Sequence, residues 1–127
     1  MIHVKATIWG EPDVLPFTRI FDYGSADEEI FFSSAAMIQE KLARKMKINA
    51  NEALVTYCVC VVKSIRAGRP ESDIQEDAQE ILSADKVMVG VPETLRVITF
   101  EAKIDSMPAI KITFKEPIPT SSYMLAG

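Results

Sequence analysis

The segment from residue 49 to residue 68, NANEALVTYCVCVVKSIRAG, places the strongest constraint on how this chain can fold. Its apolar residues cover nearly the whole circumference of a helix: Ala53, Leu54, Val55, Tyr57, Cys58, Val59, Cys60, Val61, Val62 and Ile65. A helix that is apolar on every side must be buried on every side. We therefore predict that the rest of the chain surrounds this helix, or that a partner covers part of it.

Both ends of this segment carry helix-terminating signals. Asn49 and Glu52 are spaced for a capping box, in which each side chain accepts a hydrogen bond from a backbone N–H at the helix start. Arg66 supplies a cation in the last turn, and Gly68 can adopt the left-handed conformation that ends many helices. At about 1.5 Å per residue the helix would be roughly 30 Å long, the width of a small domain.

Composition narrows the class of protein. A chain of 127 residues fits one domain with its own core. The net charge of −4, with acids and bases mixed, provides no basic stripe for nucleic acid. No apolar run reaches the roughly eighteen residues that a membrane span needs, and the start lacks a signal-peptide pattern. We therefore expect a cytoplasmic protein that binds neither nucleic acid nor membranes.

Two segments precede the first predicted helix. Residues 1–9 alternate between apolar and polar side chains, which predicts a strand, and glycine and prolines then predict a loop. Residues 17–23 are too apolar for a disordered tail, so we expect them to pack on something. A capping-box pattern at Ser25 to Glu28 predicts an amphipathic helix to about Lys47, followed by a tight corner and the central helix running antiparallel beside it.

The second half of the chain begins with further helix signals, and from residue 96 its apolar side chains alternate with polar ones. Ser72 with Gln75 predicts the cap of a short helix, and a second cap at Ser83 predicts about one turn that ends at Gly90, with Pro92 beyond it. Residues 96–104 and 110–115 alternate around a turn at 105–108, which predicts a β-hairpin, and residues 119–127 read as an exposed tail.

These segments predict the α+β class, with three or four helices around a buried central helix followed by an antiparallel hairpin. A two-stranded hairpin is marginally stable alone, so it must pack on the helices or join another strand. The segment 1–9 is the candidate for an extra, third strand.

Residues able to carry out catalysis are scarce. The sole histidine, His3, falls on the polar side of a predicted strand, where a solvated surface role is the better interpretation. Cys58 and Cys60 point about 200° apart on a helix, so they can neither form a disulfide with each other nor chelate one ion. No glycine-rich phosphate loop or clustered metal-ligand spacing is visible. The residues alone predict a domain that is not catalytic by itself.

The segment from about Leu42 to Ile118 resembles the small gamma subunit of microbial ureases. Four stretches carry the resemblance: Lys47-Ile48-Asn49 with Glu52-Ala53, Arg66 with Gly68-Arg69, the run EILSADKVMVGVPE from Glu80 to Glu93, and Glu116-Pro117-Ile118. The resemblance divides the chain into an N-terminal extension at 1–24, a gamma-like domain at 25–118 and a C-terminal tail at 119–127.

The resemblance implies a subunit of a nickel urease, the enzyme that hydrolyses urea to ammonia and carbamate. In that family the nickel ions and catalytic groups belong to the large alpha subunit, so no cofactor is expected in this chain. The implied partners are urease alpha and beta subunits, in an (αβγ) unit that is usually trimerised. The gamma chain itself is implied to be structural and non-catalytic.

Two exposed turns are the predicted partner contacts, because loop residues on a rigid scaffold often serve binding. The candidate residues are Arg66, Gly68, Arg69, Val87, Met88, Gly90, Val91 and Pro92. The competing interpretation, of about equal weight, is that the glycines and the proline only shape the backbone.

Two other functions stay open at this point. The family pattern is altered at Lys63-Ser64-Ile65, and both ends carry extra residues. These features favour a stand-alone gamma-like scaffold or binding module without urease activity, either as a monomer or as a homo-oligomer. An independent enzyme is the weakest alternative, since no base, nucleophile or metal cluster is evident.

Overall fold

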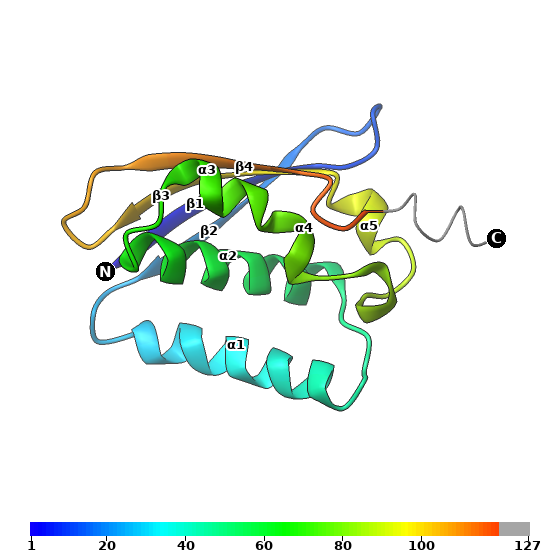
Figure 1. Ribbon diagram of the computed structural model, residues 1–127, viewed down its shortest axis with the longest axis horizontal. Coiled ribbons are helices and arrows are strands. Elements are labelled where there is room, and N and C mark those ends of the chain that lie inside the picture. The colour runs from blue at the N-terminus through cyan, green and yellow to red at the C-terminus, as the bar shows by residue number, and fades with distance from the viewer. Residues whose placement is uncertain (120–127) are drawn as a thin grey trace.

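A computed structural model describes residues 1–119 as a four-stranded sheet packed on helices (Figure 1). The strands are β1 (Ile2–Trp9), β2 (Phe17–Tyr23), β3 (Val97–Ile104) and β4 (Ile110–Lys115). The helices are α1 (Glu28–Ala43), α2 (Ala50–Arg66), α3 (Glu71–Glu76), α4 (Ala78–Ile81) and α5 (Val91–Thr94), with a 3₁₀ turn at Ala84–Lys86. The predicted α+β class is confirmed. The predicted exposed tail, 119–127, lies outside the described residues except for Pro119.

The sheet has the strand order β2-β1-β3-β4, and every neighbouring pair is antiparallel. The predicted hairpin of β3 and β4 is confirmed, and the predicted N-terminal strand joins it along the full length of β3, from Ile2 opposite Ile104 to Trp9 opposite Val97. Four side chains of β1 point into the core and are fully buried: Ile2, Val4, Ala6 and Ile8. The extension is therefore part of the central sheet.

The prediction for residues 17–23 was incomplete. These residues pack, as expected, but they do so as β2, the outermost strand beside β1. Phe21 contributes to the core and meets Phe31 of α1 edge-on, with ring centroids 5.9 Å apart. The period-two pattern is weak here because an edge strand buries few of its side chains.

Helix α2 is buried on nearly all sides, as the sequence predicted. The capping box is present: Asn49 Oδ1 accepts from the Glu52 N–H at 2.8 Å, and Glu52 Oε1 accepts from the Asn49 N–H at 3.1 Å. At the other end Gly68 adopts a left-handed φ of +75°. The sheet covers one side of α2 and α1 lies along the other, antiparallel to it (Figure 1). The chain itself therefore surrounds this helix.

Helix α1 differs from its prediction at both ends. It begins at Glu28 after Asp27, with no side-chain cap, so the capping box expected at Ser25 is absent. It ends at Ala43 rather than Lys47, because Lys45 takes a positive φ of 60° and Ile48 leaves to form a parallel bridge with Val87. Tertiary pairing thus overrides the last predicted turn of the helix.

The caps predicted after Gly68 are also wrong in detail. The next helix begins at Glu71 after Pro70, and the Ser72–Gln75 cap does not form, because the Gln75 side chain bonds to β4 instead. The predicted single helix is divided at Asp77 into α3 and α4.

The turn predicted after Ser83 is a short 3₁₀ turn, and Gly90 ends this region with φ of +92°. Pro92 lies beyond this turn, as predicted, and the structure adds a short helix that was not predicted there, α5 at Val91–Thr94, with the proline in its first turn. The β1–β2 loop touches this helix: a Cβ added at Gly10 would lie 2.9 Å from the Thr94 carbonyl oxygen.

Candidate partner-contact site

The predicted contact residues lie at the two opposite ends of α2 (Figure 1). The turn from Val87 to Pro92 lies near the start of α2, where Ile48 O accepts from the Met88 N–H at 2.9 Å. Arg66, Gly68 and Arg69 lie at the other end of the helix. Since α2 has 17 residues, the two groups are separated by roughly 25 Å. The structure does not bring them together into one site.

The turn at the start of α2 borders a hollow of about 320 Å³, which we call the corner hollow. Its lining residues are Lys47, Ala84, Asp85, Val87, Met88, Val89, Gly90, Pro92 and Glu93. Four of the eight predicted contact residues are therefore gathered around one depression.

The residues of the corner hollow differ in what they can offer a partner. Val87 and Pro92 are buried, as is their neighbour Val91 outside the hollow, so these three shape the turn from inside. Met88 is 47% exposed and Val89 is fully exposed. Sequence reasoning missed Val89, although a valine next to a turn glycine, in a chain most of whose valines fill the core, was a usable signal. The exposed apolar surface of this region is therefore Met88 and Val89.

Charged groups flank this apolar surface. Lys47, Asp85 and Glu93 line the hollow beside the two exposed side chains. The Ser83 hydroxyl donates a hydrogen bond to the Asp85 carboxylate and is the main reason that the pKa of Asp85 lies below its ordinary value. An apolar centre with a charged margin is the usual composition of a protein-binding surface.

The other predicted contacts are engaged within the chain. Arg66 pairs with Glu28 at 2.7 Å and with Asp105 at 3.0 Å, and the Met1 amino nitrogen contacts the same two carboxylates. The Arg66 guanidinium holds the pKa of Asp105 at about 2 and lowers that of Glu28. The pKa of Arg66 is raised in return by Glu28 and then Asp105. This ion cluster joins the starts of β1 and α1 to the ends of α2 and β3.

Sequence reasoning could not have found the ion cluster. Arg66 and Asp105 are 39 positions apart, and only the fold places them together. Arg69 is likewise paired, with Asp77 at 2.6 Å, and Gly68 serves the helix end. At this end of α2 the predicted residues are held by intramolecular contacts.

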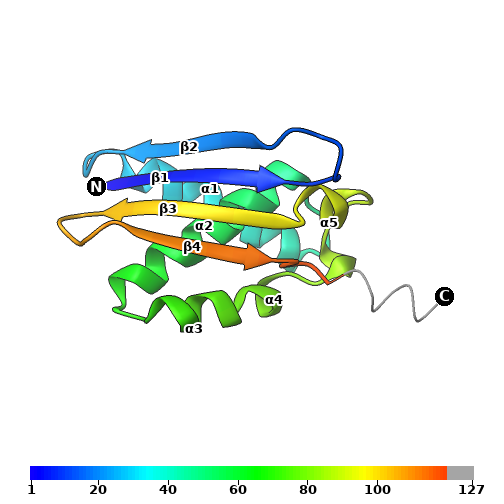
Figure 2. The same ribbon diagram turned by 90° about the horizontal axis from the view of Figure 1, so that it is seen from above.

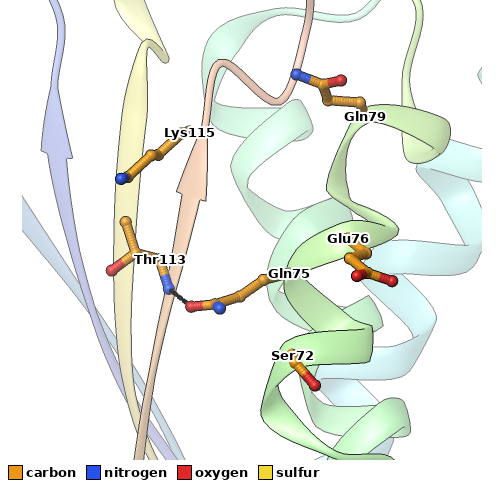
Figure 3. A pocket seen from close by; sticks show the side chains of 6 residues that line it. All are labelled: Ser72, Gln75, Glu76, Gln79, Thr113 and Lys115. Carbon is orange, nitrogen blue, oxygen red and sulfur yellow. Dashed lines mark hydrogen bonds between the residues drawn. The ribbon is translucent and has the colours of Figure 1, made fainter.

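A second, polar hollow lies between α3, α4 and β4 (Figure 3). Gln75 reaches across it, and its Oε1 accepts from the Thr113 N–H at 2.9 Å. Gln79 Nε2 donates to the Glu116 carbonyl oxygen at 3.2 Å. Both glutamines therefore satisfy backbone groups at the edge of β4, and the hollow is the space around these bridges.

Residues 1–119 hold no group of three or more His, Cys, Asp or Glu side chains arranged for a metal ion. His3 Nδ1 lies 3.5 Å from the Asp22 carboxylate on the exposed sheet face. Burial raises the pKa of both cysteine thiols, Cys58 and Cys60, the first of which is fully buried. Within the described part of the chain, no helix is long and apolar enough to cross a membrane.

The comparisons with known proteins agree on one family. Residues 25–118 match the family described as "Urease, gamma subunit". The chain is also similar to a protein named "Urease subunit gamma" from Halalkalibacterium halodurans, with 32% identity over 92 residues. That alignment covers 72% of this chain and 91% of the relative. Strands β1 and β2 lie outside the family match, whereas all the helices and the β3–β4 hairpin lie within it.

Proposed function

Because the chain belongs to the urease gamma subunit family, we propose that it is a non-catalytic structural subunit of a nickel-dependent urease, which hydrolyses urea to ammonia and carbamate. The observation that carries this proposal is the match over residues 25–118, which spans the fold from just before α1 to just after the hairpin. The cytoplasmic location expected from the sequence stays a prediction.

The nickel of such an enzyme has no fitting ligand set in residues 1–119. The only histidine lies beside Asp22 on the sheet face opposite the helices, and the described residues hold no group of three or more His, Cys, Asp or Glu side chains. The proposal therefore assigns nickel and the reacting groups to a larger partner chain and assigns this chain a role in assembly.

The partners in this proposal are urease alpha and beta subunits, with three (αβγ) units in the complete assembly. The corner hollow is the proposed contact, because Met88 and Val89 are exposed apolar side chains on a turn held rigid by hydrogen bonds to the α1–α2 connection. Arg66 and Arg69 take a smaller part, since their guanidinium groups already pair within the chain.

The proposal is tested by isolating the full-length tagged chain from its native host. We expect it to purify with a much larger chain, with nickel in stoichiometric amount and with urea-hydrolysing activity. Recovery of this chain only by itself, at native expression levels, would contradict the proposed role.

A pair of variants tests the contact. Val89→Asp should remove the larger chain from the purified material, because a carboxylate would be buried without a partner in an apolar contact. Val14→Asp is the matched control, an exposed valine in the β1–β2 loop, and should leave co-purification unchanged. Equal recovery of the larger chain with both variants would exclude the corner hollow as the contact.

One observation favours a second function. Of the two strands outside the family match, β1 covers the free edge of β3, and both strands place buried side chains in the core. A chain that completes its own sheet in this way could act as a gamma-like scaffold or binding module without urease activity. The native mass and composition of the complex separate the two functions.

A further inference from the structure

Strand β2 has an open edge. It is the terminal strand of the sheet, bonded to β1 on one side, and no other strand of the described residues pairs with its outer side. Figure 2 shows β2 outermost, with no helix beyond it. Such an edge carries a row of backbone donors and acceptors ready to pair with another strand.

Exposed apolar side chains gather along this edge. Phe17 is 50% and Ile20 is 58% exposed on β2, and the adjoining segment exposes Trp9, Val14 and Leu15. Phe17 lies on the helix-facing side of the sheet, opposite Ile8, whereas Ile20 lies on the other side, opposite Lys5, so each side of this edge presents an exposed apolar side chain. Residues 17–23 contain no proline and no lysine, and their two charged side chains are Arg19, which faces the helix side and bonds to the Asn51 side chain, and Asp22.

The sequence of β2 is complementary to itself. In antiparallel pairing centred on Ile20, the two isoleucines face each other and Phe17 faces Tyr23 of the second copy. Arg19 then faces Phe21, a pairing that repeats the contact within one chain, where the Arg19 guanidinium lies 4.5 Å from the Phe21 ring centroid. Aromatic and isoleucine pairs of this kind stabilise neighbouring strands.

Other registers are less favourable. Shifting the pairing by two residues in one direction places Arg19 opposite Arg19, and like charges directly opposite are destabilising. The same shift in the other direction places the charged Asp22 opposite Ile20. Shifting by one residue sets core-facing side chains against solvent-facing ones. Among these registers, the pairing centred on Ile20 avoids all three penalties and pairs all seven residues of the strand.

We infer that β2 is a self-association surface, through which two copies of this chain join edge to edge about a two-fold axis at Ile20. The two sheets become one continuous antiparallel sheet, with both sets of helices on the same face. This inference concerns the edge supplied by residues outside the family match, so it is independent of the corner hollow and of the proposed urease role.

The test measures the mass of the purified full-length chain by light scattering and sedimentation equilibrium, over concentrations from micromolar to submillimolar. We expect a monomer–dimer equilibrium. Ile20→Lys should raise the dissociation constant of the dimer at least roughly tenfold, because it places two ammonium groups opposite each other. Ile30→Lys is the matched control, since Ile30 of α1 is 61% exposed, and it should leave the equilibrium unchanged.

Mixing variants tests the register. Ile20→Lys and Ile20→Glu should each be monomeric alone and should form a mixed dimer together, because opposite charges then face each other across the axis. Ile20→Cys should form a disulfide-linked dimer on mild oxidation, since Cα atoms of facing residues lie about 4.5–5.5 Å apart in antiparallel sheets. The native Cys58 is buried. The parent chain, which keeps Ile20, is the control for any disulfide that forms through Cys60 instead.

Three results would overturn the inference. The first is a purely monomeric chain at submillimolar concentration. The second is a dimer that persists unchanged in Ile20→Lys. The third is equal disulfide linking of Ile20→Cys and Ile30→Cys. Far-ultraviolet circular dichroism of each variant checks that the fold is retained. Co-purification with a larger chain is measured in a separate experiment, so the test of self-association and the test of the proposed urease role give distinct results.

Discussion

The two edges of the sheet differ: the β4 edge is covered by a helix, whereas the β2 edge is open. At the β4 edge, α3 lies alongside the strand, and Gln75 accepts a hydrogen bond from the Thr113 N–H (Figure 3). At the β2 edge no strand among the described residues continues the sheet, and Phe17 and Ile20 are exposed. The covered edge lies within residues 25–118, the part that matches the urease gamma family, and the open edge lies outside it.

This difference shows what the extension does to the sheet. Without residues 1–24, the edge of β3 would be open, and it would be flanked by core side chains that β1 now covers. The extension closes that apolar edge and replaces it with another, at β2, whose side chains are half-exposed. The edge of β3 must be covered for stability, and β1 covers it. The new outer edge, at β2, is exposed and available for contact with another chain.

The largest effect is expected from removing the extension. Deletion of residues 1–24 takes away three fully buried large side chains, Ile2, Val4 and Ile8, together worth roughly 5–9 kcal/mol. That loss is comparable to the whole stability of an ordinary domain. We expect aggregation, measured by solubility and circular dichroism. A soluble chain with native helix content would show that the family-matched part folds alone and that the extension serves only contact.

A smaller effect, of opposite sign, is expected in the core beneath the covered edge. Tyr57 is fully buried against Phe114 of β4, and its hydroxyl has no hydrogen-bond partner among the described residues. Tyr57→Phe should raise the free energy of unfolding by about 1 kcal/mol, because an unsatisfied polar group is removed. Tyr23→Phe, at a partly exposed position, is the control. Destabilisation by Tyr57→Phe in urea titrations would contradict this interpretation.

One hydrogen bond that covers the β4 edge can be removed by a single substitution. Gln75→Ala leaves the Thr113 N–H without its side-chain acceptor and should lower the free energy of unfolding by about 1 kcal/mol. Ser72→Ala, in the same hollow but away from the β4 backbone, should have little effect. Urea titration of both variants measures the difference. Equal stability of the two variants would mean that α3 covers β4 by packing alone.

The smallest effect concerns the ion cluster that ties the start of β1 to the turn after β3. The Arg66 guanidinium lowers the pKa of Asp105 from 3.8 to about 2, so this pairing adds stability above pH 4 and loses it as the pH falls toward 2. Arg66→Gln should therefore be less stable than the parent chain at pH 7, with the gap closing below pH 4. Arg44→Gln removes an exposed pair and is the control. A gap that stays constant to pH 2 would exclude the pairing as its source.

The parts of the fold that the sequence predicted are those governed by local rules. The all-round apolar pattern and the Asn49–Glu52 box specified α2, and strict alternation specified β1, β3 and β4. The errors fall where distant contacts take over. Gln75 was assigned to a helix cap but bonds to β4, and the helix predicted to run to about Lys47 ends at Ala43, before the bridge between Ile48 and Val87.

The candidate site was predicted in part for the same reason. The turn glycine and the run from Val87 to Pro92 marked the corner hollow, because chain reversals leave a local signature. The partners of Arg66 left no such signature, since they come from the starts and ends of other elements. From the sequence, the Arg66 guanidinium was expected to be available to a partner chain. In the structure it is paired with two carboxylates of its own chain.

The near-contact between Gly10 and Thr94 has a consequence for how such a subunit can vary. The loop between the two added strands rests against α5, the short helix that follows the corner hollow, with no room for even one carbon atom more. Any side chain at position 10 would push on the backbone at the end of that helix, which follows the turn that carries Met88 and Val89. The loop between the first two strands thus contacts the helix that follows the surface we expect a partner to recognise, so substitutions in that loop are limited by its fit against α5.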